Sequence, residues 1–231
     1  MGFKPIKEFS IKYHNTGGGE VSSQSFLERA IKNKSLIVDF CKRNHFKPTN
    51  ILEIGFGKYP KCLELLNEHF NPDHIYGVDK LDYKHNSNIK TFQSFDQLPG
   101  NLKFDLIYSI DVMEHVIDPL LLNKSIVKKS ENNALIIHSI DLTSHYHNPK
   151  GINAFKHYIY NKKLWHLMTS NRSSFTNRKR SKDWYSLFEE DFSNIYFEEI
   201  EHPLKKEIIS KFEFLKKGDI ISRINLSLRL K

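Results

Sequence analysis

The chain has 231 residues, and its 35 Lys and Arg outnumber its 27 Asp and Glu, which gives a formal net charge of +8. This length is enough for one α/β domain with a buried core and short for two. No run of about twenty apolar residues occurs, so we expect no transmembrane helix, and the N-terminus lacks the apolar core of a signal peptide. Cys41 and Cys62 are the two cysteines, and we expect buried thiols in a reducing cytoplasm instead of a disulfide or metal pair.

Helical and strand patterns alternate along the chain. Apolar residues at helical spacing predict helices over 22–45, 61–70, 118–130 and 184–190. Short apolar runs predict strands over 51–54, 75–79, 89–92, 104–110, 133–139, 191–201 and 220–231. This alternation predicts a doubly wound α/β fold with a mostly parallel sheet and right-handed crossovers.

We expect one domain over residues 1–231. It comprises an N-terminal arm and helix, a cofactor-binding core, a substrate cap, and a C-terminal helix with two strands. The corresponding ranges are 1–46, 47–141, 142–182 and 183–231.

The apolar run that begins at Ile51 ends in a Gly-x-Gly turn at Gly55 and Gly57, and the next run ends in Asp79. Glycine lets the backbone approach a ligand without a Cβ in the way, and an acid in that place can accept hydrogen bonds from a ribose diol. The turn continues as Lys-Tyr-Pro over 58–60. The third glycine of the dinucleotide fingerprint is therefore missing, which disfavours NAD and FAD. On its own, the turn is equally compatible with a plain strand-to-helix connection.

The Glu-x-Gly-x-Gly pattern over 53–57, followed by Asp79, resembles the class I S-adenosylmethionine (SAM)-dependent methyltransferases. Residues 104–116 read Phe-Asp-Leu-Ile-Tyr-Ser-Ile-Asp-Val-Met-Glu-His-Val and resemble the fourth strand and active-site turn of that superfamily. Asp-Pro at 118–119 matches its ubiquinone-biosynthesis branch. The resemblance implies a Rossmann-like seven-stranded sheet with an antiparallel C-terminal hairpin, SAM as cofactor, and methyl transfer.

The resemblance also implies which residues bind the cofactor. The two glycines should pass close to the methionine part of SAM, and the glutamate before them should order the turn. The aspartate after the second strand should take the ribose hydroxyls, while its neighbours along the edge should surround the adenine. The predicted cofactor-binding residues are Glu53, Gly55, Gly57, Asp79, Lys80, Phe95, Asp96 and Ile110.

His145 and His115 are the candidate general bases, because both follow strands at the edge where such sheets bind ligands. Asp141 could orient either imidazole, as carboxylates do for catalytic histidines. The alternative for each histidine is a structural role at the end of a strand.

The acid-x-x-Glu-His pattern formed by Asp111, Glu114 and His115 also occurs in two groups that bind a divalent cation there. These are some ubiquinone-pathway O-methyltransferases and the small-RNA 3′-terminal 2′-O-methyltransferases. A Mg²⁺ or Mn²⁺ site completed by His138 or His145 is therefore an alternative, although no metal is favoured.

The alternation breaks over 142–182, at the carboxyl end of the fifth strand, so we interpret this segment as a cap over the acceptor. It contains no Asp or Glu and many Lys and Arg. Such a field attracts anions, although a solvated basic face is the plainer reading. Residues 138–146, Trp165, Asn-Arg at 177–178 and Tyr-Ser-Leu-Phe at 185–188 are similar to methyltransferases of bacterial surface-polysaccharide gene clusters.

That resemblance implies O-methylation of a sugar, or of a phosphorylated or nucleotide-linked precursor of a surface polysaccharide or capsule. The expected partner is a small, polar, anionic acceptor. One alternative is a metal-assisted RNA 2′-O-methyltransferase, supported by the net charge and by cap aromatics that could stack bases. Another is a non-catalytic SAM-fold partner subunit. Nucleic acid is disfavoured but open, and the oligomeric state is not predicted.

Overall fold

The computed structural model describes residues 23–80, 89–144, 151–169, 175–203 and 220–230. The first half contains α2 (Ser23–Arg43), β1 (Asn50–Ile54), α3 (Lys61–Phe70), β2 (His74–Val78), β3 (Lys90–Phe92), the 3-10 helix η1 (Phe95–Gln97) and β4 (Phe104–Ile110). The second half contains η2 (Met113–His115), α4 (Pro119–Lys129), β5 (Ser130–Asp141), η3 (Gly151–Tyr158), α5 (Lys162–Thr169), α6 (Ser181–Phe188), β6 (Phe192–Glu201) and β7 (Ile221–Leu230).

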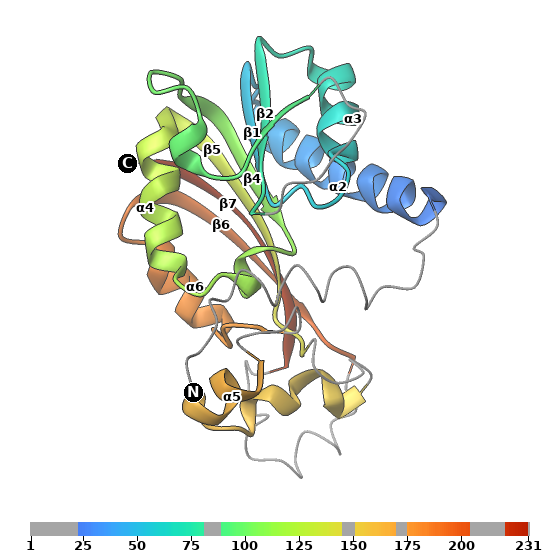
Figure 1. The fold of residues 1–231 in the computed structure, drawn as a ribbon, viewed down its shortest axis with the longest axis vertical. Helices are drawn as coiled ribbons and strands as arrows, with labels where there is room; N and C mark the ends of the chain where they lie inside the picture. The colour runs from blue at the N-terminus through green and yellow to red at the C-terminus, as the bar shows by residue number, and fades with distance from the viewer. Residues whose placement is uncertain (1–22, 81–88, 145–150, 170–174, 204–219, 231) are drawn as a thin grey trace, which may run out of the picture.

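The strands form one seven-stranded sheet in the order β3-β2-β1-β4-β5-β7-β6. The pairs among β1 to β5 are parallel, and β7 runs antiparallel to both β5 and β6. The predicted α/β fold with a mostly parallel sheet and an antiparallel C-terminal hairpin is confirmed (Figure 1).

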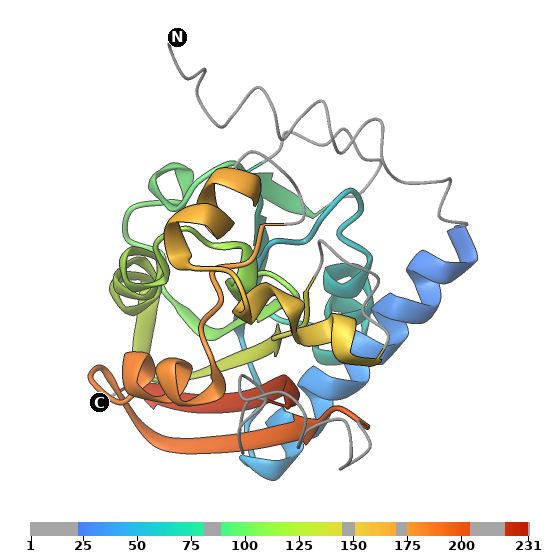
Figure 2. The ribbon, with the colours of Figure 1, turned by 90° about the horizontal axis from the view of Figure 1, so that it is seen from below.

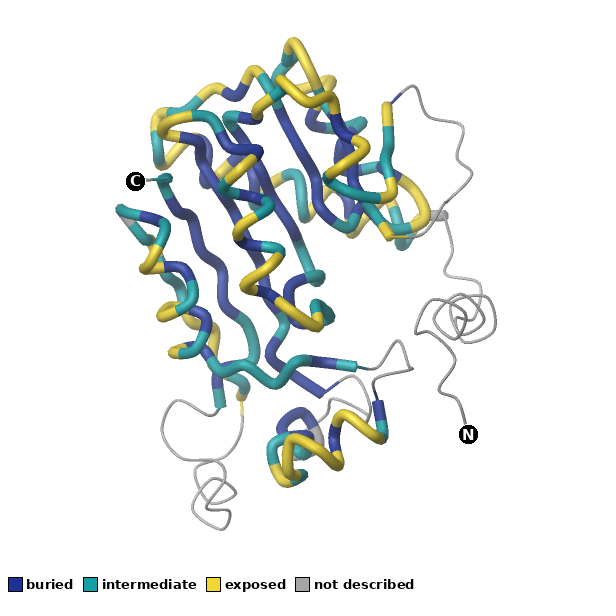
Figure 3. Tube along the Cα trace, turned by 60° about the vertical axis from the view of Figure 1, so that its left-hand side comes forward, coloured by how far each residue is buried: buried dark blue, intermediate teal, exposed yellow. Residues whose placement is uncertain are grey.

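Helices cover both faces of the sheet, with α2 and α3 on one face and α4 and α6 on the other (Figure 1). Successive strand residues therefore point into different cores: Ile51 packs with the α2 and α3 side chains, and Leu52 with those of α4 and α6. Figure 3 shows the buried strands between helices whose outer turns are exposed. Burial on both faces explains why the parallel strands read as continuous apolar runs.

Several helix ends differ from the prediction for local reasons. The α6 helix begins at Ser181, earlier than predicted, because the Asp183 side chain accepts a hydrogen bond from the Arg180 N–H, 2.9 Å away. In α3, Leu63 is fully buried, while Leu65 is half-buried and packs against the edge of the same core cluster. The two cysteines are free and buried, as predicted.

The cap elements η3 and α5 lie beyond the carboxyl end of the parallel strands (Figures 1 and 2). Trp165 is buried inside the cap, and its Nε1–H donates to the Thr176 carbonyl oxygen at 2.7 Å. Phe155 is also buried, with its ring against that of His202, which follows β6. The cap is therefore packed both within itself and against the residue that follows β6. Within the part of the chain that the structure describes, no helix is long and apolar enough to span a membrane.

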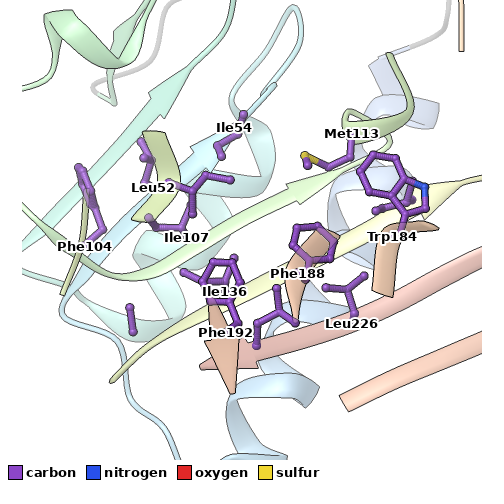
Figure 4. Close-up of a cluster of buried hydrophobic side chains, with 14 of the residues drawn as sticks. Leu52, Ile54, Phe104, Ile107, Met113, Ile136, Trp184, Phe188, Phe192 and Leu226 are labelled. Atoms are coloured by element: carbon purple, nitrogen blue, oxygen red, sulfur yellow. The ribbon is translucent and has the colours of Figure 1, made fainter. Parts of the chain in front are cut away.

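Phe188 of α6 lies at the centre of the larger core cluster (Figure 4). Its ring stacks on those of Trp184 and His138, with centroids 6.0 and 5.3 Å away. We expect Phe188→Ala to lower the free energy of unfolding by about 3–5 kcal/mol, because it removes a fully buried ring. Leu167→Ala, at a side chain that is 71% exposed, should change it by less than about 0.5 kcal/mol. Urea unfolding measures both, and equal midpoints for the two variants would contradict the assigned core.

Candidate active site

The glycine turn after β1 is fixed by sterics and by one backbone hydrogen bond. Gly55 has a φ of +77°, and its N–H donates to the Val78 carbonyl oxygen at 2.7 Å. A Cβ at Gly55 would overlap the Val112 side chain. Only glycine meets both constraints without a local rearrangement.

Gly57 makes the contact that joins the two predicted cofactor signals. Its N–H donates to Asp79 Oδ2 at 2.9 Å, although the two residues belong to different loops. Its φ is +70°, and a Cβ there would meet nothing within 4 Å. The backbone at Gly57 therefore faces open space, with the Asp79 carboxylate beside it.

The other predicted cofactor residues lie along the same edge of the sheet. Lys80 and Asp96 are exposed, and Ile110 is half-buried at the end of β4. Phe95 is partly buried and packs against the larger core cluster, so part of its role is structural. Their contact with a cofactor stays a prediction.

Glu53 is buried in β1 beneath the glycine turn. Burial raises the pKa of its carboxyl to about 8; the Tyr108 hydroxyl works against this rise, and the Asp79 charge adds to it. The carboxyl is therefore mostly protonated at neutral pH. Glu53 supports the turn as a neutral polar group, since burying a charge there would be costly.

Arg223 of β7 organises the acidic end of the site, although it was not among the site residues predicted from the sequence. Its Nη1 donates to Asp111 Oδ1 at 2.6 Å and to Ser139 Oγ at 2.8 Å, and its Nη2 lies 3.7 Å from Asp141 Oδ2. Asp111 has a left-handed backbone conformation with a φ of +57°, and its N–H donates a hydrogen bond to the Ser139 carbonyl oxygen. A basic residue within an otherwise alternating strand was the only signal available in the sequence.

Asp141 has hydrogen-bond and ion-pair partners in Thr143 and Arg223, and its role in orienting His115 or His145 stays a prediction. Its Oδ1 accepts hydrogen bonds from the Thr143 N–H at 2.8 Å and the Thr143 hydroxyl at 2.7 Å, while its Oδ2 faces Arg223. These bonds make Asp141 a cap for the segment that follows β5.

Glu114 is the buried polar group whose hydrogen-bonding needs are least met. Its side chain is 2% exposed, and within the described residues neither carboxyl oxygen has a hydrogen-bond partner. Burial raises its pKa well above the usual value, and the Asp111 charge adds to this shift. A buried carboxyl without hydrogen-bond partners is unusual in a folded protein, and a polar group of a bound ligand is one way to satisfy it.

His115 is held by the cap. Its Nδ1 lies 2.6 Å from the Phe175 carbonyl oxygen, which can only accept, so Nδ1 carries the hydrogen. In the neutral ring, Nε2 is then the basic nitrogen. Three hydrogen bonds from Asn177 reinforce this docking: Nδ2 donates to Met113 O and Val116 O, and the backbone N–H donates to Glu114 O.

His138 is a core residue and not a ligand. It is fully buried, its Nδ1 lies 2.8 Å from Ser109 Oγ, and burial lowers its pKa to about 3. This corrects the suggestion that His138 could complete a metal site. The other candidate, His145, lies outside the described residues. Across the described ranges, no group of three or more His, Cys, Asp or Glu is arranged to hold a metal ion.

Residues 24–202 match the family described as a methyltransferase domain. The chain belongs to this family. No curated protein matches it, but solved structures do. One is the plantazolicin methyltransferase BpumL with a monoazolic desmethylPZN analog and S-adenosylhomocysteine, at 14% identity and a TM-score of 0.56, covering 97% of this chain and 90% of that one.

Two further structures are similar to this methyltransferase-family chain. N-methyltransferase NodS from Bradyrhizobium japonicum WM9, with S-adenosylhomocysteine, shares 12% identity at a TM-score of 0.55 and 97% coverage of both chains. A SAM-dependent methyltransferase from Mesorhizobium loti shares 16% identity at a TM-score of 0.50, with 79% of this chain and 91% of that one covered. At such identities the likeness shows the fold.

The buried Glu53 gives a pH-dependent prediction. Its folded-state pKa of about 8 lies above the ordinary 4.5, so the folded state binds more protons between these values and stability falls as pH rises through them. Glu53→Gln cannot titrate. The stability of this variant relative to wild type should therefore rise between pH 5 and pH 8, by up to about 1.4 kcal/mol per pH unit.

Urea unfolding at a series of pH values measures this difference. Glu68→Gln, at an exposed position of α3, controls for the loss of a surface charge. If the difference in unfolding free energy between Glu53→Gln and wild type does not change with pH, the buried carboxyl ionises normally.

Proposed function

We propose that this chain is a SAM-dependent methyltransferase. The observation that carries the proposal is the Gly57–Asp79 hydrogen bond beside open space at the carboxyl edge of β1 and β2. S-adenosylhomocysteine bound in the BpumL and NodS structures supports the same cofactor class. The retained glycine turn also argues against a non-catalytic partner subunit.

The residues present fit this cofactor. The glycine turn, Gly55 to Gly57, would hold the methionine part, and Asp79 would accept hydrogen bonds from the ribose hydroxyls. Lys80, Phe95 and Asp96 would surround the adenine. When bound, SAM supplies an electrophilic methyl group on a sulfonium.

The chain's own residues provide orientation and a route for the acceptor's proton. Methyl transfer to a hydroxyl needs in-line geometry, which is the larger contribution, and a base that adds about 10²–10⁴-fold. His115 meets the requirement for a base, because the hydrogen bond from its Nδ1–H to the Phe175 carbonyl oxygen leaves Nε2 as the basic nitrogen. His145 is the second candidate base.

For the acceptor we favour a sugar hydroxyl on a phosphorylated or nucleotide-linked precursor of a bacterial surface polysaccharide. The cap without acidic residues supports an anionic acceptor. An RNA acceptor is less favoured, because Phe155 and Trp165 are buried instead of offering faces to bases. A metal-assisted methyl transfer is less favoured, because Asp111, one of the candidate metal ligands, already pairs with Arg223.

The cofactor assignment predicts a difference between two aspartates at opposite ends of β2. Asp79→Asn removes the charge from the predicted ribose-binding group and should weaken S-adenosylhomocysteine binding by about 10- to 100-fold, the loss of one or two charge-assisted hydrogen bonds. Asp73→Asn removes the same charge at an exposed position before β2 and should leave affinity unchanged. Calorimetry measures both, and equal affinities for the two variants would remove Asp79 from the site.

The base assignment predicts a specific kinetic pattern. With an acceptor found by screening nucleotide sugars and sugar phosphates for methyl transfer from radiolabelled SAM, His115→Asn should lower kcat by about 10²–10⁴-fold. S-adenosylhomocysteine affinity should stay within twofold of wild type. A parallel screen of amines tests N-methylation, the reaction class named for NodS. An unchanged kcat in His115→Asn would transfer the role to His145.

A further inference from the structure

Arg178, in the segment that joins α5 to α6, is a half-buried cation. Its Nη2 donates to the Tyr158 carbonyl oxygen at 3.2 Å, and its buried Nε has no hydrogen-bond partner within the described residues. In the same ranges no carboxylate forms an ion pair with it. Burial lowers the pKa of its guanidinium; Tyr158 opposes this shift, and the neighbouring Arg180 charge adds to it. Such a group gains stability from a bound anion.

The backbone at Arg178 is also strained. Its φ of +60° lies in the left-handed region, which non-glycine residues seldom occupy and which is often retained at functional sites.

A second guanidinium meets the same residue, at its ring instead of its backbone carbonyl. The Cζ of Arg180 lies 4.2 Å from the ring centroid of Tyr158, within the range of a cation–π contact. Burial raises the pKa of the Tyr158 hydroxyl, against the opposing effect of the two arginine charges. The Tyr158 hydroxyl therefore keeps its proton and is able to donate a hydrogen bond.

This group lies next to the reaction edge. Asn177, the residue before Arg178, forms hydrogen bonds with the η2 turn at Met113, Glu114 and Val116. The Asp141 charge at the end of β5 is close enough to influence Tyr158.

We propose that Arg178, Arg180 and Tyr158 form a subsite for a phosphate group of the acceptor. Two guanidinium groups balance the charge of roughly −2 that a phosphate monoester carries near neutral pH, and the guanidinium fork matches phosphate oxygens in geometry. This inference rests on the proposed function, because it assigns the substrate class of the same site.

The test uses glucose 1-phosphate and glucuronate as probes, titrated into the full chain by calorimetry. Glucose 1-phosphate should bind saturably to wild type. Arg178→Gly should weaken it by at least about tenfold, the equivalent of one lost charge-assisted hydrogen bond, and Arg178→Lys should give an intermediate loss because the fork is gone. Lys163→Gln, which removes one charge from an exposed position of α5, should stay within twofold.

A second readout separates binding from a structural role. Glycine accepts the φ of +60° without strain, so Arg178→Gly should keep or raise the Tm while losing the phosphate probe. A large drop in Tm would make Arg178 structural and overturn the subsite. Three other results would also overturn the subsite. Lys163→Gln could weaken glucose 1-phosphate binding as much as Arg178→Gly does, or glucuronate could bind to wild type as tightly as glucose 1-phosphate. The third is that wild type does not bind glucose 1-phosphate at all.

Binding of S-adenosylhomocysteine, measured on the same samples, keeps the two proposals distinct. If wild type binds S-adenosylhomocysteine but the glucose 1-phosphate results contradict the prediction, only the subsite is rejected. Failure of wild type to bind S-adenosylhomocysteine rejects the proposed function itself.

Discussion

The whole site depends on the parallel register of β1, β2 and β4. Ile54 pairs with Val78 on one side and with Ser109 on the other, so the three strands end at nearly the same level of the sheet. The residues that follow them therefore emerge together, and Gly57 can reach Asp79. A register slip of one residue would turn every side chain of the slipped strand to the other face and would disrupt the packing of both cores. The hydrophobic cores thus fix the geometry of the glycine turn.

The antiparallel β7 adds what a parallel sheet alone cannot supply. Because β7 runs in the opposite direction, its first residues lie at the carboxyl edge of its neighbours, and Arg223 comes to face Asp141. The Arg223–Asp111 pair is partly open to solvent, with side chains 29% and 40% exposed, so its contribution to stability is modest. Its larger effect is to orient Asp111 beside the buried Glu114, which has no described hydrogen-bond partner.

Sequence patterns predicted the features that depend on local chemistry. The strand runs, the Gly-x-Gly turn and the position of Asp79 all follow from apolar periodicity and from the backbone demands of glycine. The Arg223 contact was beyond such reasoning, because it joins residues 112 positions apart. His138 was misplaced because β5 continues to Asp141, past the predicted end at 139. A histidine expected near the edge therefore lies inside the sheet, stacked on Phe188.

The cap and the candidate base cannot be treated as separate parts. The carbonyl of Phe175 sets which nitrogen of His115 carries the hydrogen, and Asn177 holds that carbonyl's segment against the turn after β4. A shift of the cap would release the Nδ1–H and allow the other tautomer, in which Nε2 is no longer basic. Arg178 continues the same segment, so an anion bound there would stabilise the docked position of the cap. Recognition of the acceptor and readiness of the base would then be two results of the same docking, without any movement of the sheet.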